Sequence, residues 1–141
     1  MNRIIISENP EDTKRAGTEL SLLLKGDETI ALDGDLGVGK TVFVKGLAAG
    51  LEINEEILSP TFTILKEYCG RFPLYHFDVY RISDICEMTE VGYYDYIGKG
   101  ICVIEWSELI RDILPENMIK VNIERISENS RKIEIKMLRE K

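Results

Sequence analysis

One segment constrains the fold of this chain more than any other: residues 34–41 read Gly-Asp-Leu-Gly-Val-Gly-Lys-Thr and fit the pattern G-x-x-x-x-G-K-[ST]. The compact apolar run 29–33 leads into this segment, and residues 42–51 after it have the spacing of a helix. A phosphate-binding loop requires this order of strand, glycine-rich loop and helix, because backbone N–H groups and the helix N-terminus then point at one anion. A tight turn with no ligand would leave the adjacent Gly-Lys-Thr unexplained.

The composition of the loop predicts a nucleoside triphosphate as its ligand, with ATP and ADP as the expected nucleotides. Lys40 brings a positive charge to the β and γ phosphates, and Thr41 offers its hydroxyl to Mg²⁺. The residues expected to contact the nucleotide around this loop are Asp35, Leu36, Gly37, Val38, Gly39, Lys40, Thr41 and Val42.

The rest of the chain predicts an α/β protein with a P-loop NTPase-like three-layer fold, a mixed, mostly parallel central sheet and a C-terminal β-hairpin. Residues 101–104 are continuously apolar, as in a strand buried on both faces of a parallel sheet. Alternation at 119–123 and 133–137, around a turn at 127–130, predicts the hairpin. The other expected elements are a strand at 4–6, a helix at about 10–25 ended by Gly26, two strands at 62–68 and 74–80 joined as a hairpin, two helical pieces within 83–97 broken near Gly92, and a short helix at 107–113. All 141 residues fit a single domain, 1–141.

The composition predicts a protein that stays in the cytoplasm. No segment has the length and hydropathy of a signal peptide or a membrane span. The three cysteines are odd in number and widely spaced, which favours reduced thiols over a disulfide framework or a zinc site. The net charge of −7 repels polyanions, so we expect contact with nucleic acid only through a partner.

Two acids follow apolar runs and are candidates for the magnesium site. Glu105 follows the run 101–104, which is the better candidate for a central parallel strand, so we assign Glu105 to the metal. Asp78 is then a second carboxylate, suited to orient the attacking water or to sense the γ-phosphate. The alternative for Asp78 is a strand-end acid that caps the turn near Ser83 or pairs with Arg81.

Three residues near these acids in the sequence are interpreted as structural. His76, the only histidine, lies between two aromatic residues in a strand and is interpreted as a packed, hydrogen-bonded residue. Trp106 follows Glu105 and is interpreted as a packing residue that shields the site, and Cys102 as a core residue.

The motifs together resemble the bacterial TsaE family, formerly called YjeE. They are the phosphate loop, Ser-Pro-Thr-Phe-Thr at 59–63, Tyr-His-Phe-Asp-Val-Tyr-Arg at 75–81, and Glu105-Trp106, in this order over nearly the whole chain. The resemblance implies a small P-loop ATPase needed to make N6-threonylcarbamoyladenosine beside the anticodon of tRNA. It also implies two protein partners, the threonylcarbamoyl transferase TsaD and its companion TsaB, with tRNA contacted only through that complex.

The resemblance also implies roles for single residues. Lys40 is similar to the phosphate lysine, Thr41 and Glu105 to the Mg²⁺ ligands, and Asp78 to a residue needed for hydrolysis. Residues 59–63 resemble a switch-like segment near the γ-phosphate, which makes Thr61 a catalytic candidate. A residue at the turn of the C-terminal hairpin lies near adenine in the family, which points to Ser130 or Arg131.

Two other classes of function use the same loop. A small-molecule P-loop kinase would pass the γ-phosphate to a bound acceptor, and it usually adds an arginine-bearing lid and an acceptor domain. A nonhydrolytic ATP-dependent interaction module would use ATP only to lock an interface. Because the loop contains no arginine and Arg81 is poorly placed after Asp78, we expect hydrolysis to be slow alone and faster with partners.

Overall fold

The computed structural model describes residues 2–35, 37–58 and 64–137. Its strands are β1 (Asn2–Ser7), β2 (Thr29–Asp33), β3 (Leu65–Cys69), β4 (Pro73–Asp78), β5 (Ile101–Glu105), β6 (Ile119–Arg125) and β7 (Arg131–Met137). Its helices are α1 (Pro10–Ser21), α2 (Lys40–Gly50), α3 (Cys86–Glu90), α4 (Tyr93–Tyr96) and the 3-10 helix η1 (Ser107–Ile113).

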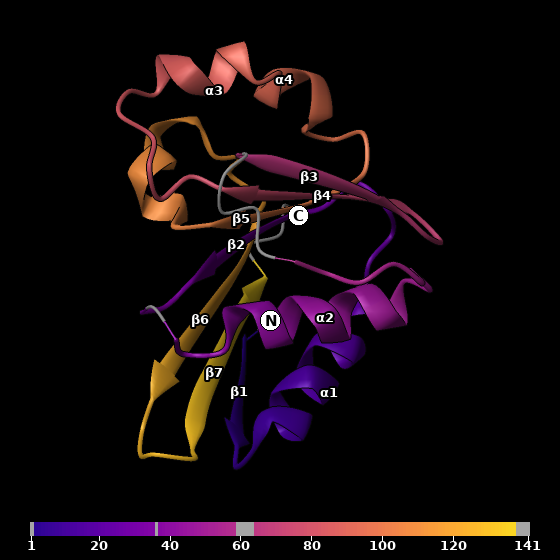
Figure 1. The fold of residues 1–141 in the computed structure, drawn as a ribbon, viewed down its shortest axis with the longest axis vertical. Helices are drawn as coiled ribbons and strands as arrows, with labels where there is room; N and C mark the ends of the chain where they lie inside the picture. Colours follow the sequence, from indigo (N-terminus) through magenta and orange to yellow (C-terminus); the bar gives the residue numbers. More distant parts are fainter. Residues whose placement is uncertain (1, 36, 59–63, 138–141) are drawn as a thin grey trace.

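The described strands form one seven-stranded sheet in the order β1-β7-β6-β2-β5-β4-β3 (Figure 1). The pairs β6–β2, β2–β5 and β5–β4 are parallel, and the pairs β3–β4, β6–β7 and β7–β1 are antiparallel. Strands β1, β6, β2, β5 and β4 therefore run in one direction and β7 and β3 in the other. This confirms the predicted mixed, mostly parallel sheet and its C-terminal hairpin.

Helices cover both faces of the sheet, which confirms the three-layer fold. On one face α1 and α2 pack on apolar side chains of β2, β4, β5, β6 and β7, such as Leu32, Leu74 and Val103. On the other face α3, α4 and η1 pack on Phe77 and Ile104. The side chains of β5 alternate between the two cores, and all five of its residues are buried, as expected of the central parallel strand.

The predicted helix at about 10–25 is wrong at its C-terminal end, because α1 ends at Ser21. The amides of residues 22–24 bond to carbonyls three residues back, which tightens the last turn. The Glu28 carboxylate then accepts hydrogen bonds from the backbone N–H groups of residues 25–27, at 2.8–3.2 Å. The amides that a longer helix would use are thus held by a side chain.

Other boundaries differ by about two residues. Helix α2 begins at Lys40 rather than Val42, and β4 ends at Asp78 rather than Tyr80. The predicted helix at 107–113 is a 3-10 helix with a kink at Ile110. Residues 62–63 of the predicted strand 62–68 lie outside the described residues.

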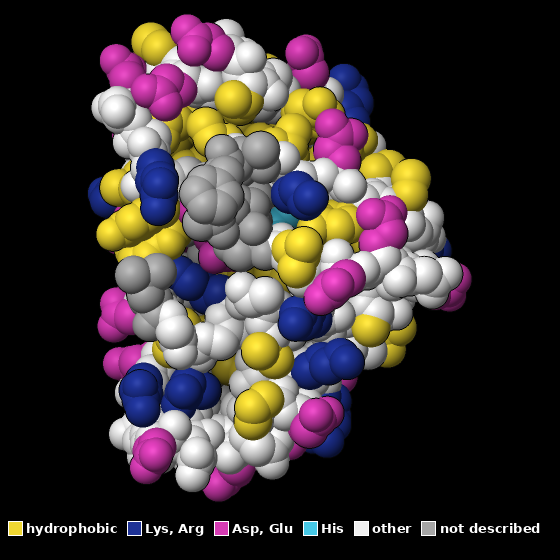
Figure 2. All heavy atoms as spheres, in the orientation of Figure 1, with side chains coloured by type: hydrophobic (Ala, Val, Ile, Leu, Met, Phe, Trp, Pro, Cys, Tyr) yellow, Lys and Arg dark blue, Asp and Glu magenta, His cyan; other side chains and the backbone are white. Residues whose placement is uncertain are grey.

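Charges of both signs are mixed on one face of the molecule (Figure 2). Figure 2 shows acidic and basic side chains interspersed over the described part of the face that carries α1 and α2. None of the helices in the described ranges has the length and apolar character needed to cross a bilayer.

Candidate nucleotide-binding site

The glycine-rich loop joins β2 to the N-terminus of α2. Gly39 precedes the helix with a φ of 114°, a left-handed conformation that side chains rarely allow, and no side chain caps the helix start. Gly37 also has a positive φ, of 75°, and a Cβ there would meet nothing within 4 Å. The first turn of α2 therefore opens onto space that an anion can enter.

The Lys40 side chain lies across the loop. Its ammonium donates a hydrogen bond to the Gly34 carbonyl at 2.6 Å and sits 4.0 Å from the centroid of the Trp106 ring. The Trp106 ring packs in turn on Tyr80, with centroids 4.7 Å apart. Trp106 thus covers Lys40, the packing role expected from the sequence.

The two candidate acids lie side by side at the ends of neighbouring parallel strands. Asp78 and Glu105 are register partners in β4 and β5, and strand alternation directs both toward the face that carries α2. A cavity of about 300 Å³ is lined by Gly37, Gly39, Lys40, Thr41, Val42, Asp78, Glu105 and Trp106. The candidate phosphate lysine, the candidate metal hydroxyl and both acids therefore share one cavity.

Glu105 is almost fully buried and makes a hydrogen bond that the sequence did not predict. Its Oε2 lies 2.6 Å from Nε2 of His76, whose side chain is fully buried. The interpretation of His76 as a packed, hydrogen-bonded residue is confirmed, and its partner is the candidate metal ligand. Alternation along β4 was the available signal, because it places His76 and Asp78 on the same face of the strand.

Burial raises the pKa of the Asp78 carboxyl, and the nearby Glu105 raises it further, while a hydrogen bond from the Tyr80 backbone N–H at 3.0 Å lowers it. The carboxylate is therefore a stronger base than an ordinary aspartate, which suits a group that orients or deprotonates water. Asp78 also caps a turn, as the alternative interpretation held, but through Tyr80. Among the described residues it bonds to neither Ser83 nor Arg81.

The residues at the cavity fit a magnesium ion bound together with phosphate. Among the described residues no three His, Cys, Asp or Glu side chains form a self-sufficient metal site. A phosphate-bound Mg²⁺ needs only one or two protein ligands, because phosphate oxygens and water complete its shell. Thr41 and Glu105 supply oxygens of the kind that this hard cation prefers, and Asp78 adds a second carboxylate.

A third acid at the same sheet edge, Asp33, has a structural role. Alternation places it on the opposite face from Glu105, and its carboxylate accepts hydrogen bonds from the N–H and hydroxyl of Ser107 at 2.8 and 2.7 Å. These bonds fix the turn at Trp106, whose φ of 61° is unusual for a large side chain. Asp33 thereby holds the end of β5 that carries Glu105.

A second cavity, of about 230 Å³, lies on the other side of the first turn of α2. It is lined by Asn9, Pro10, Thr13, Gly37, Val38, Gly39, Val42, Glu128, Asn129 and Arg131. Arg131 joins the hairpin to the loop, since its Nε donates to the Val38 carbonyl at 2.9 Å and one terminal nitrogen donates to three turn carbonyls. Val42 lines both cavities, so one ligand along the helix start can reach both.

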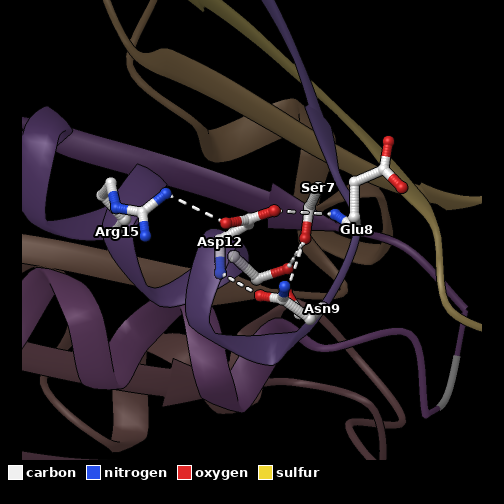
Figure 3. Close-up of polar contacts among 6 residues, drawn as sticks. Ser7, Glu8, Asn9, Asp12 and Arg15 are labelled. Carbon is white, nitrogen blue, oxygen red and sulfur yellow. Dashed lines mark hydrogen bonds and ion pairs between the residues drawn. The ribbon is translucent and has the colours of Figure 1, made fainter.

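The start of α1 lines this second cavity, and hydrogen bonds hold its polar side chains (Figure 3). The Asn9 side chain caps the helix by accepting from the Asp12 N–H at 2.8 Å, and the Asp12 carboxylate accepts from the Glu8 N–H at 3.0 Å. The buried hydroxyls of Ser7 and Thr13 are 2.7 Å apart, and Ser7 also donates to the Asn9 carbonyl. Each polar group named here has a hydrogen-bond partner, and these bonds hold the start of α1 in place beside the cavity.

The remaining predicted contact residues are less informative. Asp35 is exposed in the loop, and its carbonyl accepts from the Val38 N–H at 3.3 Å. Leu36 and the segment 59–63, which includes the catalytic candidate Thr61, lie outside the described residues. Ser130 donates its N–H to the Ser127 hydroxyl and, unlike Arg131, is not among the residues that line the second cavity.

The loop between β2 and α2, with its lysine, hydroxyl and strand-end carboxylates on a largely parallel sheet, defines a P-loop nucleotide-binding protein. A family model described as "Threonylcarbamoyl adenosine biosynthesis protein TsaE" matches residues 7–133. The chain belongs to the TsaE family.

Individual relatives are similar over most of their length. The chain is 43% identical over 131 residues to the tRNA threonylcarbamoyladenosine biosynthesis protein TsaE of Treponema pallidum, covering 92% of this chain and 97% of that protein. It is 44% identical over 127 residues to the protein of the same name from Bacillus subtilis, covering 89% and 79%. The crystal structure of Bacillus subtilis YdiB superposes with a TM-score of 0.82 at 36% identity, covering 99% of this chain and 87% of that one.

Proposed function

We propose that this protein binds and hydrolyses Mg-ATP in the cytoplasm and supports tRNA N6-threonylcarbamoyladenosine biosynthesis as the ATPase of a complex with TsaD and TsaB. The observation that carries the ATPase assignment is the shared cavity of Lys40, Thr41, Asp78 and Glu105. The family membership supports the pathway.

In this proposal the β and γ phosphates bind the N–H groups of the loop, and the Lys40 ammonium leaves the Gly34 carbonyl for a phosphate oxygen. Thr41 and Glu105 hold Mg²⁺, which supplies positive charge to the phosphate oxygens when it is bound. Asp78 orients the attacking water, and its raised pKa favours acceptance of the water proton. Thr61 stays a catalytic candidate from the family resemblance.

The second cavity supports a site for the adenine base. It lies at the same helix start as the phosphate loop, and it offers a ring-sized space beside the Arg131 guanidinium, whose plane can stack on a base. Gly37, Gly39 and Val42 line both cavities and Val38 lines the second, while Asp35 and Leu36 stay contact candidates from the sequence.

Partner stimulation follows from the charges at the first cavity. Lys40 is the only cation among the described residues that line it. Arg81 is exposed and lies beyond the end of β4. An arginine supplied by another chain contributes about 10³ to 10⁵ in rate to enzymes of this class. Partners can supply that charge, and the net charge of −7 is compatible with a protein that meets tRNA only through them.

The test is steady-state phosphate release by the protein alone and with TsaD and TsaB, with Lys40→Ala as the matched control. We expect slow release alone, at least a tenfold increase with both partners, and none above background for Lys40→Ala. Fast release that the partners leave unchanged would refute partner stimulation. Transfer of labelled γ-phosphate to a small acceptor would favour a kinase, and tight ATP binding without phosphate release in the full mixture would favour a nonhydrolytic module.

A further inference from the structure

His76 is the only histidine of the chain. Its burial in the core does not explain why this position carries an imidazole rather than an apolar side chain. Its side chain is fully buried in β4, with Leu74 two residues before it on the same strand face. Its Nδ1 is the one buried side-chain nitrogen or oxygen among the described residues without a hydrogen-bond partner. An unpaired buried nitrogen costs free energy that an apolar ring in its place would avoid.

The other ring nitrogen makes the one polar contact of this side chain. Nε2 of His76 lies 2.6 Å from Oε2 of Glu105, and this is the single hydrogen bond that the Glu105 carboxylate makes within the described residues. A carboxylate that is 4% exposed needs a partner to stay in place. We therefore interpret the hydrogen bond as holding the Glu105 carboxylate in place rather than as a contribution to packing of the apolar core.

The contact also fixes the direction of the carboxylate. With Oε2 held by His76, rotation about the last bond of the Glu105 side chain is restricted, and Oε1 is the oxygen left for a ligand in the cavity shared with Thr41. A partner behind a metal-binding side chain acts in this way in many metal sites, where its loss lowers metal affinity about 10- to 100-fold.

We propose that His76 is a positioning residue for Glu105: it donates a hydrogen bond from Nε2 to Oε2 and thereby orients Oε1 toward Mg²⁺. This inference rests on the proposed function, in which Glu105 is the metal ligand. It assigns His76 no contact with the nucleotide, so removal of the donor changes the Mg²⁺ dependence of binding and leaves metal-free binding intact.

Three variants separate positioning from stability. His76→Phe keeps a ring of similar size and removes the donor, and His76→Gln places an amide N–H near the position of Nε2. Leu74→Ala removes buried volume from the same strand and face with no polar atom involved, so it controls for a loss of stability alone.

The measurement is ADP binding by calorimetry, in EDTA and across a Mg²⁺ titration. We expect His76→Phe to raise the apparent Mg²⁺ dissociation constant about tenfold with ADP binding in EDTA unchanged, His76→Gln to stay within about threefold of wild type, and Leu74→Ala to lower the melting temperature only. An unchanged Mg²⁺ constant in His76→Phe overturns the proposal, as does an equal loss in Leu74→Ala.

A second measurement uses the wild-type protein and stands even if His76→Phe does not fold. Nitrogen NMR of the single histidine ring, without metal, reports which nitrogen carries the proton. A proton on Nε2 is expected, and a ring protonated on Nδ1 alone overturns the proposal. If wild-type protein binds no Mg-ADP at all, the proposed function fails, whereas normal wild-type binding with an indifferent His76 refutes only the positioning role.

Discussion

Replacing Gly46 by alanine tests how closely α1 and α2 must approach to place the loop beside α1. A Cβ at Gly46 would lie 2.7 Å from the carbonyl carbon of Lys14 and closer still to its oxygen, whereas ordinary contacts of this kind are 3.4–4 Å. The atoms in the way belong to the backbone of α1, so α1 and α2 must move apart to make room for the new Cβ. Parting them also stretches the hydrogen bond from the Thr18 hydroxyl to the Gly46 carbonyl, now 2.8 Å.

The contributions of Gly46→Ala to stability have opposite signs, so the sign of the measured change in the free energy of unfolding shows which contribution dominates. Alanine favours the helix over glycine by about 1 kcal/mol, while overpacking costs about 1–3 kcal/mol or more and loss of the hydrogen bond about 1 kcal/mol. With overpacking at the upper end, the free energy of unfolding should fall by about 2–3 kcal/mol, and the melting temperature by roughly 5–10 °C.

The assay is urea unfolding followed by circular dichroism, with Lys45→Ala as the control on the exposed side of the same helix. That control should stay within about 0.5 kcal/mol of wild type. If Gly46→Ala is as stable as wild type, or more stable, the helices do not approach as described and the reasoning is refuted.

Three further predictions concern the metal site, the thiols and tRNA. Glu105→Gln should weaken the Mg²⁺ dependence of ADP binding by at least about tenfold and leave ADP binding in EDTA unchanged. Asp78→Asn should leave nucleotide affinity unchanged and slow phosphate release by about 10²-fold or more. The reverse pattern in calorimetry and rate assays would exchange the roles of the two acids. A thiol reagent at pH 8 should label exposed Cys69 and Cys86 in the native protein and Cys102 only after unfolding, because burial raises the pKa of the Cys102 thiol to about 12; fast labelling of all three would contradict the packing. The isolated protein, with its net charge of −7, should bind tRNA little at physiological salt, and tight binding in a salt-titrated filter assay would reveal a basic face that the net charge hides.

The loop and most of the sheet were predictable because their signals are local. Glycine and lysine spacing predicts the loop at 34–41, the apolar run predicts β5, and alternation predicts the hairpin of β6 and β7. The end of α1 was not predictable from leucine spacing, because the Glu28 carboxylate takes the amides after it.

The interactions that complete the site join residues distant in sequence. His76 and Glu105 are 29 residues apart, and Arg131 reaches the Val38 carbonyl across 93 residues. Such contacts depend on strand order and register, which a motif does not contain. Alternation could place His76 on the same strand face as Asp78. It could not show that β5 pairs with β4 in the register that puts Glu105 opposite Asp78.

The central claim is that residues 34–41 hold the phosphates of Mg-ATP, and a crystal structure with a nonhydrolysable ATP analogue and Mn²⁺ tests it most directly. We predict the β and γ phosphates on the N–H groups at the start of α2, with the Lys40 ammonium moved from the Gly34 carbonyl to a phosphate oxygen. The anomalous signal of Mn²⁺ should lie between Thr41 and Glu105. Phosphates bound away from this loop, or Mn²⁺ bound while Lys40 stays on the Gly34 carbonyl, would contradict the account.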